Sequence, residues 1–300
     1  MTEGHNTKQI WRGASGFLRV LAVSSLVMLV GACEEVVDPV LETGRPFTLF
    51  GFLDPGSNQQ AIRVFPIEPV LAQTQALPLD ATVQVTGPGQ PVVFADSIVY
   101  YRDGSVGHVF HAGFQPQFGT TYHISARDSR DQETTVTVRT PERAIITLGE
   151  AGGILGNVLM PVAIEDAEQI LSPRALYTFE STKAPFLWTI PVVYDADVLR
   201  SGDSWSVIVD LSRDIGVLFT VAGLTPGLHP IILTDLRVQA FVTTDAWTPP
   251  EGTFDRELLV QPGVFSNVDN GFGFVGAGYV EGANTLPAAE VLRLAGFANE

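Results

Sequence analysis

The sequence predicts an all-β protein: an immunoglobulin-like β-sandwich followed by a second antiparallel β domain, with one or two short peripheral helices. Short segments of alternating or β-branched residues recur along the chain, and turns rich in Gly, Pro and Asp separate them. The chain is 45% hydrophobic and 17% charged, which is too apolar for a disordered protein and enough for one large core or two smaller ones. We therefore expect two packed β domains.

The first 32 residues have the pattern of a secretory signal. Lys8, Arg12 and Arg19 precede an uncharged, apolar run over residues 20–32. As a helix, this run of 13 residues would be about 20 Å long, which is shorter than the roughly 30 Å hydrocarbon core of a membrane. We therefore expect residues 1–32 to be a cleaved signal peptide rather than a membrane span.

Cys33 is the only cysteine, and it follows a Val-Gly-Ala triplet at the position where a bacterial lipoprotein would be cut and acylated. The small residues let the backbone enter a peptidase site, and the thiol can carry a thioether-linked lipid. Stable anchoring needs two or more acyl chains, which a lipoprotein modification supplies. Cys33 is thus the predicted lipidation site, and residues 33–45 are the acylated cysteine and its tether. The alternatives are an ordinary signal peptide that happens to contain a cysteine, and a free core thiol.

The charge of the chain limits its possible partners, and the residue after Cys33 indicates its location. Residues 1–32 hold three Lys or Arg and one acidic residue, so 14 of 17 basic and 32 of 33 acidic residues remain, a net charge of −18. This charge argues against binding to nucleic acid or adsorption to anionic lipid, because both need clustered basic residues. By bacterial sorting rules, Glu34 rather than Asp after the cysteine favours the outer membrane. A single cysteine also excludes an intramolecular disulfide.

Residues 46–141 are the predicted immunoglobulin-like domain. Asp54-Pro55-Gly56 is typical of a tight turn, and Arg127–Asp131 of a charged hairpin tip. Some seven short strands in about 95 residues match an immunoglobulin-like sandwich in number and spacing. A different Greek-key arrangement would give the same pattern. The clearest strand patterns lie at 47–53, 61–65, 82–86, 91–101, 122–126 and 134–139.

Residues 142–300 are the predicted second β domain. Alternation or β-branching indicates most of its strands. A helix of two turns could form at Glu165–Leu171, and Thr285 could cap a helix at 286–295 that ends at Gly296. We expect both helices to be peripheral. The strand patterns lie at 144–148, 158–164, 176–179, 186–194, 205–211, 217–221 and 236–243.

Catalytic patterns in the chain are weak. Gly202-Asp203-Ser204 is similar to the tripeptide around a trypsin-like nucleophile, but Trp205 stands where the next Gly should be, and no upstream base motif occurs. We expect this tripeptide to close a turn before a strand. A glycosidase needs two carboxylates at a set separation, and among the 32 acidic residues after position 32 no two stand out. We therefore predict no catalytic residue and a protein that is not an enzyme.

Two groups of side chains are candidates for a metal site. Three histidines lie close in sequence, but strand residues three apart point to opposite faces, and zinc needs at least three converging ligands. An acidic loop could offer oxygens to calcium, but it lacks the Gly and the terminal Glu of an EF-hand loop. We expect ordinary strand side chains and solvated turn acids, and hence no metal. The candidates are His108, His111 and His123, and Asp195, Asp197 and Asp203.

Gly271, Gly273 and Gly276 formally match the G-x-G-x-x-G string of dinucleotide-binding loops, but that string must open a helix after a strand. The aromatic residues between these glycines indicate a strand instead. Glycines in a strand let it bend or let another backbone approach closely. We therefore predict no cofactor.

Trp247 is the residue that we select as a candidate ligand contact. It precedes Thr248-Pro-Pro-Glu-Gly252, an irregular loop of the kind that often carries binding residues, and its ring could stack on a sugar. The alternative is local packing against the Pro-Pro segment. Trp188 and Trp205 lie in apolar strand patterns, so we expect them in the core.

Six landmarks of the chain are Cys33, residues 50–54, residues 80–85, Phe114 with residues 119–122, residues 140–141 and residues 266–274. Together they resemble a family of outer-membrane lipoproteins classed only as a domain of unknown function, often encoded near TonB-dependent transporters of the polysaccharide-uptake type. The resemblance covers both ends of the chain after the signal. It implies a periplasm-facing or surface lipoprotein with an immunoglobulin-like N-terminal domain, and it brings no assigned catalytic residue.

The leading hypothesis is a non-enzymatic, lipid-anchored envelope protein that assists an outer-membrane assembly. Its expected partners are the membrane, through the N-terminal lipid, and a TonB-dependent transporter. The alternative is a secreted polysaccharide or peptide hydrolase with an immunoglobulin-like spacer, which requires two converging carboxylates or a Ser-His pair in the second domain. A third hypothesis is an adhesive surface protein. The single copy of each domain and the short tether count against it.

Overall fold

The computed structural model describes residues 44–67, 76–102, 104, 106–154, 156–248 and 266–298. These residues belong to one compact unit. Strands account for 57% of the structure and helices for 9%, so the all-β prediction is confirmed. The signal, Cys33 and the tether as far as residue 43 lie outside the described residues. Within the described part of the chain, no helix is long and apolar enough to cross a membrane.

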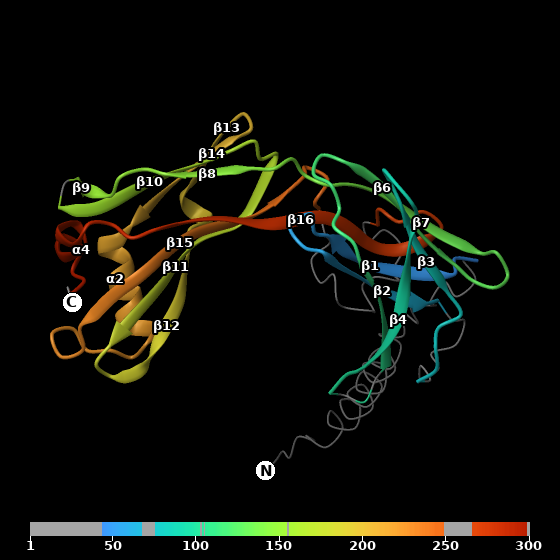
Figure 1. Ribbon diagram of the computed structural model, residues 1–300, viewed down its shortest axis with the longest axis horizontal. Helices are drawn as coiled ribbons and strands as arrows, with labels where there is room; N and C mark the ends of the chain where they lie inside the picture. The colour runs from blue at the N-terminus through green and yellow to red at the C-terminus, as the bar shows by residue number, and fades with distance from the viewer. Residues whose placement is uncertain are drawn as a thin grey trace, which may run out of the picture. The chain divides into compact units, whose positions relative to one another are not determined.

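The first seven strands form an immunoglobulin-like β-sandwich (Figure 1). Their hydrogen-bonded order is β1-β2-β5-β4-β3-β6-β7. With the strands lettered A to G along the chain, this order is A-B-E-D followed by C-F-G, the two sheets of an immunoglobulin domain. The bounds are β1 Phe47–Leu53, β2 Gln59–Pro66, β3 Thr82–Thr86, β4 Val92–Tyr100, β5 Val106–Gly113, β6 Thr121–Arg127 and β7 Glu133–Arg139.

The core of this sandwich follows the two-residue period of its strands. In β2, Ile62 and Val64 are fully buried while Ala61 and Arg63 are exposed, and in β6 Ile124 and Ala126 are fully buried. The sheet closes on itself where Thr135 of β7 and Asp269 exchange backbone hydrogen bonds of 3.0 and 2.7 Å. At this point the edge of β7 is therefore paired rather than open.

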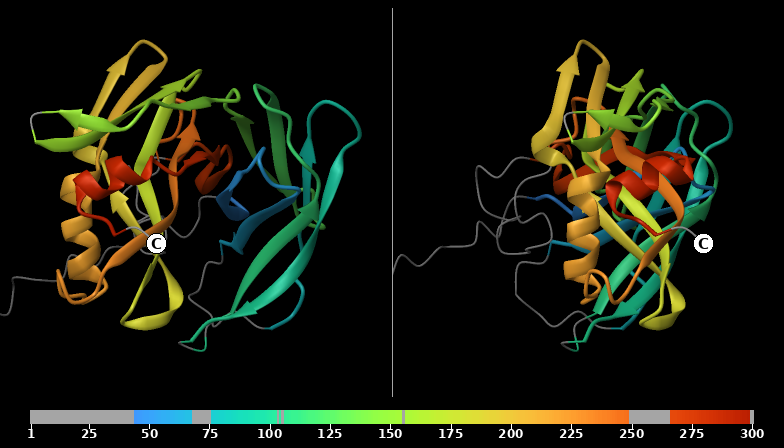
Figure 2. Two further views of the ribbon diagram at one scale, coloured as in Figure 1. Left: turned by 60° about the vertical axis from the view of Figure 1, so that its left-hand side comes forward. Right: turned by 90° about the vertical axis from the view of Figure 1, so that its left-hand side faces the viewer.

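The second part of the chain places two antiparallel sheets around a helix. One sheet has the order β12-β11-β15-β16 and the other β13-β14-β10-β8, with β9 paired to β10. Helix α2 packs against β10 of one sheet and β12 of the other, and α4 lies beside α2 (Figures 1 and 2). The bounds are β8 Ile145–Leu148, β9 Gly152–Ile154, β10 Asn157–Glu165, β11 Gln169–Ser181, β12 Ala184–Val193, the 3-10 turn η1 Asp195–Asp197, β13 Val198–Ser201, β14 Ser204–Asp210, α2 Leu211–Val221, β15 Ile231–Thr243, β16 Gly271–Thr285 and α4 Ala289–Ala295.

Strand β16 is shared by the two parts. Residues 271–277 pair in parallel with β1, and residues 278–285 pair antiparallel with β15. The predicted boundary at residue 141 falls between β7 and β8, yet Val275 and Ala277 belong to the core of the sandwich. One continuous strand therefore contributes to both cores.

The glycines of β16 lie in a strand, as predicted. A Cβ atom on Gly273 would lie 2.1 Å from the Leu49 backbone oxygen, and one on Gly276 would lie 2.6 Å from the ring of Trp247. The missing side chains let the backbone of β1 and the indole ring approach β16 closely. The G-x-G-x-x-G string is thus a packing feature of a sheet.

The helix expected at Glu165–Leu171 is wrong. Strand β10 ends at Glu165, Asp166 turns the chain with a φ of 60°, and β11 begins at Gln169. Of the buried apolar residues of this segment, Ala167 lies in the turn and Ile170 in β11. A tertiary pairing of β10 and β11 with other strands therefore overrides the local pattern.

The strand expected at 217–221 is also wrong, because these residues form the second half of α2. Their β-branched side chains favour a strand by propensity. However, Leu211, Ile215 and Leu218 recur at helical spacing and are buried. Asp210 caps the helix, and its Oδ1 accepts a 3.0 Å hydrogen bond from the backbone of the third helical residue. Packing and capping together therefore favour a helix over a strand at these residues.

The C-terminal helix is present but shorter than expected. Helix α4 begins at Ala289 rather than at 286, and Thr285 is the last residue of β16 instead of a cap. The helix ends before Gly296, which has a φ of 101°, as predicted for a C-terminal glycine.

Candidate functional site

Trp247 lies in an aromatic cluster formed with Phe52, Phe241 and Phe274. Its ring centroid is 5.0 Å from that of Phe241, 5.5 Å from Phe274 and 5.9 Å from Phe52. Trp247 is half-buried, and Phe52, which is 41% exposed, is the most solvent-accessible ring. Trp247 therefore packs locally against these rings. The Pro-Pro segment at 249–250, against which packing is the expected alternative, lies outside the described residues. Ligand contact by Trp247 stays a prediction.

The three candidate histidines do not share a site. His108 of β5 is buried, and its Nδ1 lies 2.9 Å from Asp96 Oδ2. His111 is exposed on the same strand, and its Nδ1 lies 3.2 Å from Ser97 Oγ. His123 lies on another strand, β6. The predicted opposite orientation of strand residues three apart is confirmed. Across the ranges that the structure describes, no three His, Cys, Asp or Glu side chains gather in a way that could hold a metal ion.

The Gly-Asp-Ser tripeptide and the acidic loop belong to turns. Gly202, with a φ of 64°, and Asp203 make the two-residue turn between β13 and β14, so Ser204 opens β14 as expected. Asp197 Oδ2 accepts a 3.0 Å hydrogen bond from Arg213 Nη1. Gly202 and Asp203 thus shape a hairpin, and the Asp197 carboxylate is paired with the Arg213 guanidinium.

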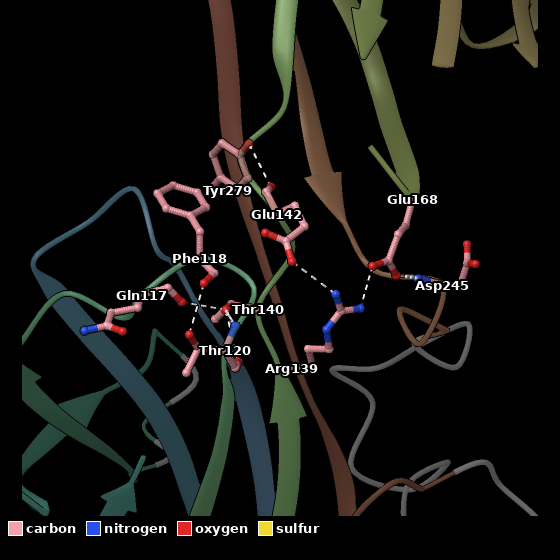
Figure 3. Close-up of polar contacts among 9 residues, drawn as sticks. All are labelled: Gln117, Phe118, Thr120, Arg139, Thr140, Glu142, Glu168, Asp245 and Tyr279. Atoms are coloured by element: carbon pink, nitrogen blue, oxygen red, sulfur yellow. Dashed lines mark hydrogen bonds and ion pairs between the residues drawn. The ribbon is translucent and has the colours of Figure 1, made fainter. Parts of the chain in front are cut away.

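The junction between the two parts is built on the segment that follows β7 (Figure 3). Thr140 Oγ1 accepts a 2.9 Å hydrogen bond from the Thr120 amide. The Tyr279 hydroxyl of β16 accepts a 2.6 Å hydrogen bond from the Ala144 amide, and its ring lies edge-on to Phe118 at 5.0 Å. Burial raises the pKa of Tyr279, so the hydroxyl keeps its proton. This junction fixes the start of the second part against β16.

Arg139 lies between two carboxylates at the same junction (Figure 3). Its Nη1 is 2.6 Å from Glu168 Oε1, and its Nη2 is 3.3 Å from Glu142 Oε1. The hydrogen bond to Glu168 raises the pKa of Arg139. Converging carboxylates are what the hydrolase alternative requires, but here a guanidinium lies between them and pairs with both. The arrangement is an ion-pair bridge from the end of β7 to the turn before β11.

A buried polar network lies in the second core. Asp214 of α2 is fully buried, and its Oδ2 accepts hydrogen bonds from the Tyr177 hydroxyl at 2.5 Å and from the Tyr194 hydroxyl. Its Oδ1 accepts a 3.2 Å hydrogen bond from Arg213 Nε. Burial raises the pKa values of Asp214, Tyr177 and Tyr194. The network satisfies a carboxyl group that would otherwise be costly to bury.

The chemistry of this network is structural. Tyr177 and Tyr194 are buried like Asp214, and Tyr177 also stacks on Phe297 at 6.3 Å, so three acidic or phenolic groups are closed off from solvent. The hydrogen bonds join α2 to β11 and to the end of β12. Sequence reasoning missed this network. The available signal was Asp214, an acidic residue on the face that Leu211 and Leu218 define at helical spacing.

No protein-family model matches the chain, and no curated protein matches it. The resemblance to outer-membrane lipoproteins therefore stays a prediction. Fold and site together define an immunoglobulin-like sandwich joined through β16 to a second β sandwich with a helix in its core.

Proposed function

We propose that this chain is a lipid-anchored envelope protein with a non-enzymatic binding or accessory role at the bacterial outer membrane. Cys33, at the end of the apolar run, is the observation that carries the proposal. The first described residue, Gly44, follows it by 11 positions, and a chain of that length spans at most about 40 Å. A tether of this length would keep both β parts near the membrane surface.

The way in which the two β parts are joined supports a binding role. β16 runs through both parts, with the aromatic cluster packed on one stretch of it and Tyr279 bonded to the segment after β7. A strand shared by two parts restrains their movement relative to each other. Pre-organisation of that kind lowers the entropy cost of binding.

The partner that we propose is an outer-membrane transporter of the TonB-dependent type, which the family resemblance implies. A lipid-anchored protein and a transporter in one membrane meet at high effective concentration, so a weak contact suffices. The net charge of −18 on the chain after residue 32 counts against nucleic acid as a partner.

The test compares the full-length protein with Cys33→Ala in the cells that the chain comes from. Intact-mass measurement of the mature protein reports lipid on Cys33, and membrane fractionation reports anchoring. Crosslinking, detergent extraction, affinity purification and mass spectrometry then identify neighbours. We expect an acylated mature form that begins at Cys33, and one outer-membrane transporter recovered with the wild type only. An unlipidated wild type, or equal membrane recovery of the variant, overturns the proposal.

A further inference from the structure

The outer face of the sheet β13-β14-β10-β8 is uncharged across its middle. In one row of cross-strand neighbours, Leu199 lies beside Ser206, Ser206 beside Ala163, and Ala163 beside Thr147. In the next row, Ile208 lies beside Pro161. We call these six residues the uncharged face: Thr147, Pro161, Ala163, Leu199, Ser206 and Ile208.

Alternate residues of the same strands point inward, which leaves this face to solvent. Val162, Val207 and Val209 are buried in the core, whereas Leu199 is 69% exposed and Ile208 is 51% exposed. Helix α2 lies on the inner side of the sheet, and among the described residues no helix or strand lies on the outer side (Figure 1). The solvent face of an antiparallel sheet is normally polar. An open face with aliphatic side chains and no charge is therefore a candidate interaction surface.

The border of the uncharged face is acidic. Asp210 at the end of β14 lies beside Leu159, Glu165 lies beside Ile145, and the exposed Asp203 lies in the turn that precedes β14. Two copies packed face to face would bring such borders together, and like charges across an interface oppose association. The complementary surface is an uncharged or apolar patch bordered by Lys and Arg.

The size of the face also argues against a stable dimer. The four strands, which hold 4, 7, 9 and 4 residues, lie about 4.8 Å apart and rise about 3.3 Å per residue, so this side of the sheet covers roughly 380 Å². A stable interface buries about 800 Å² on each partner. A face of half that area suits a weak contact between proteins that are held near each other.

We propose that the uncharged face is the docking surface for a protein in the same membrane whose own contact patch is apolar with a basic border. This inference rests on the proposed function, because the lipid anchor supplies the local concentration that a small face requires. Ile208 and Leu199 insert into the partner's patch, and Glu165 faces its basic border.

The experiment places a photo-crosslinking amino acid at Ile208 in the full-length protein in the cells that the chain comes from. The matched control carries the same amino acid at Val93, an apolar residue that is 62% exposed on β4 of the sandwich. In parallel, Ile208→Asp and Val93→Asp add one charge to each face without touching a core. Glu165→Lys reverses one border charge. Partners and the crosslinked peptides are identified by mass spectrometry.

We expect position 208 to crosslink one membrane protein at an apolar patch flanked by Lys or Arg, and position 93 not to do so. Recovery of that protein falls at least tenfold with Ile208→Asp and severalfold with Glu165→Lys, and it is unchanged with Val93→Asp. Crosslinks to a second copy of this chain, to a soluble protein or only to lipid overturn the inference, as does equal crosslinking from both positions or none. If Cys33 is acylated and the protein is anchored but position 208 fails, the proposed function stands and the docking face does not.

Discussion

Gly273 tests how closely β16 packs against β1. Its φ is +107°, and a Cβ atom there would lie 2.1 Å from the Leu49 backbone oxygen. Leu49 is fully buried in β1, so the obstructing atom belongs to packed backbone and not to the free end of a side chain. Gly273→Ala must therefore move β1 away from β16 along their parallel pairing.

The expected loss follows from three terms. A non-glycine residue held at positive φ costs about 1–3 kcal/mol. Forcing extra volume into packed structure costs about 1–3 kcal/mol. Replacing Gly by Ala restricts the unfolded chain, which returns about 0.4–1 kcal/mol. The free energy of unfolding should fall by about 2–4 kcal/mol, a large share of the 5–15 kcal/mol that a typical protein has.

The assay is urea unfolding of the purified protein, followed by tryptophan fluorescence and by circular dichroism. Gly153→Ala in β9 is the matched control, because a Cβ atom there has nothing within 4 Å. That control should change the free energy of unfolding by less than about 1 kcal/mol. A Gly273→Ala protein within about 0.5 kcal/mol of the wild type would refute the close-approach argument, since the backbone and packing terms together exceed the unfolded-chain term by more than that.

Substitutions at two further positions test the second part of the chain. Burial raises the pKa of Asp214 above 3.8, so the folded state binds this proton more tightly than the unfolded state. Asp214→Asn should lower the free energy of unfolding by about 1–3 kcal/mol, and its difference from the wild type should shrink as pH rises from about 3.8 through the raised pKa. Urea titrations between pH 4 and 8 measure this difference. A difference that widens as pH rises contradicts the assignment. Lys183 Nζ donates to the Ala222 and Gly223 carbonyls at 2.9 and 2.7 Å, at the C-terminal end of α2. Lys183→Met should lower the free energy of unfolding by about 0.5–1.5 kcal/mol, and Lys183→Arg by less; equal melting temperatures for the wild type and the Met variant would show that these bonds contribute nothing.

Strands with a regular period and clear turns could be predicted from the sequence. The expected strands at 47–53 and 82–86 have the observed bounds of β1 and β3. Their alternation reflects burial of one face, and adjacent turn residues end them, so the information is local. The same local logic predicted opposite orientations for His108 and His111, and a strand through Gly271–Gly276.

Elements whose local pattern is ambiguous needed the tertiary structure. Residues 217–221 are β-branched and aromatic, yet they complete α2 because Leu218 must fill the space between two sheets. A two-turn helix is expected at residues 165–171, yet these residues turn between two strands that pair elsewhere. Propensities differ by less than about 1 kcal/mol per residue, so burial of a few large side chains outweighs them.

The sequence by itself determined the all-β class and the candidate lipidation site at Cys33, because these depend on period, turn chemistry and short motifs. It predicted an immunoglobulin-like first part, and the strand order of the structure distinguished this arrangement from other Greek keys. The tertiary structure decided what depends on residues far apart in the chain. It brings residues 271–277 beside β1, buries Asp214 of α2 against Tyr177 of β11 and Tyr194 after β12, and exposes Ile208 on an uncharged sheet face. Such contacts arise from long-range pairing and packing, for which a single sequence carries no local signal.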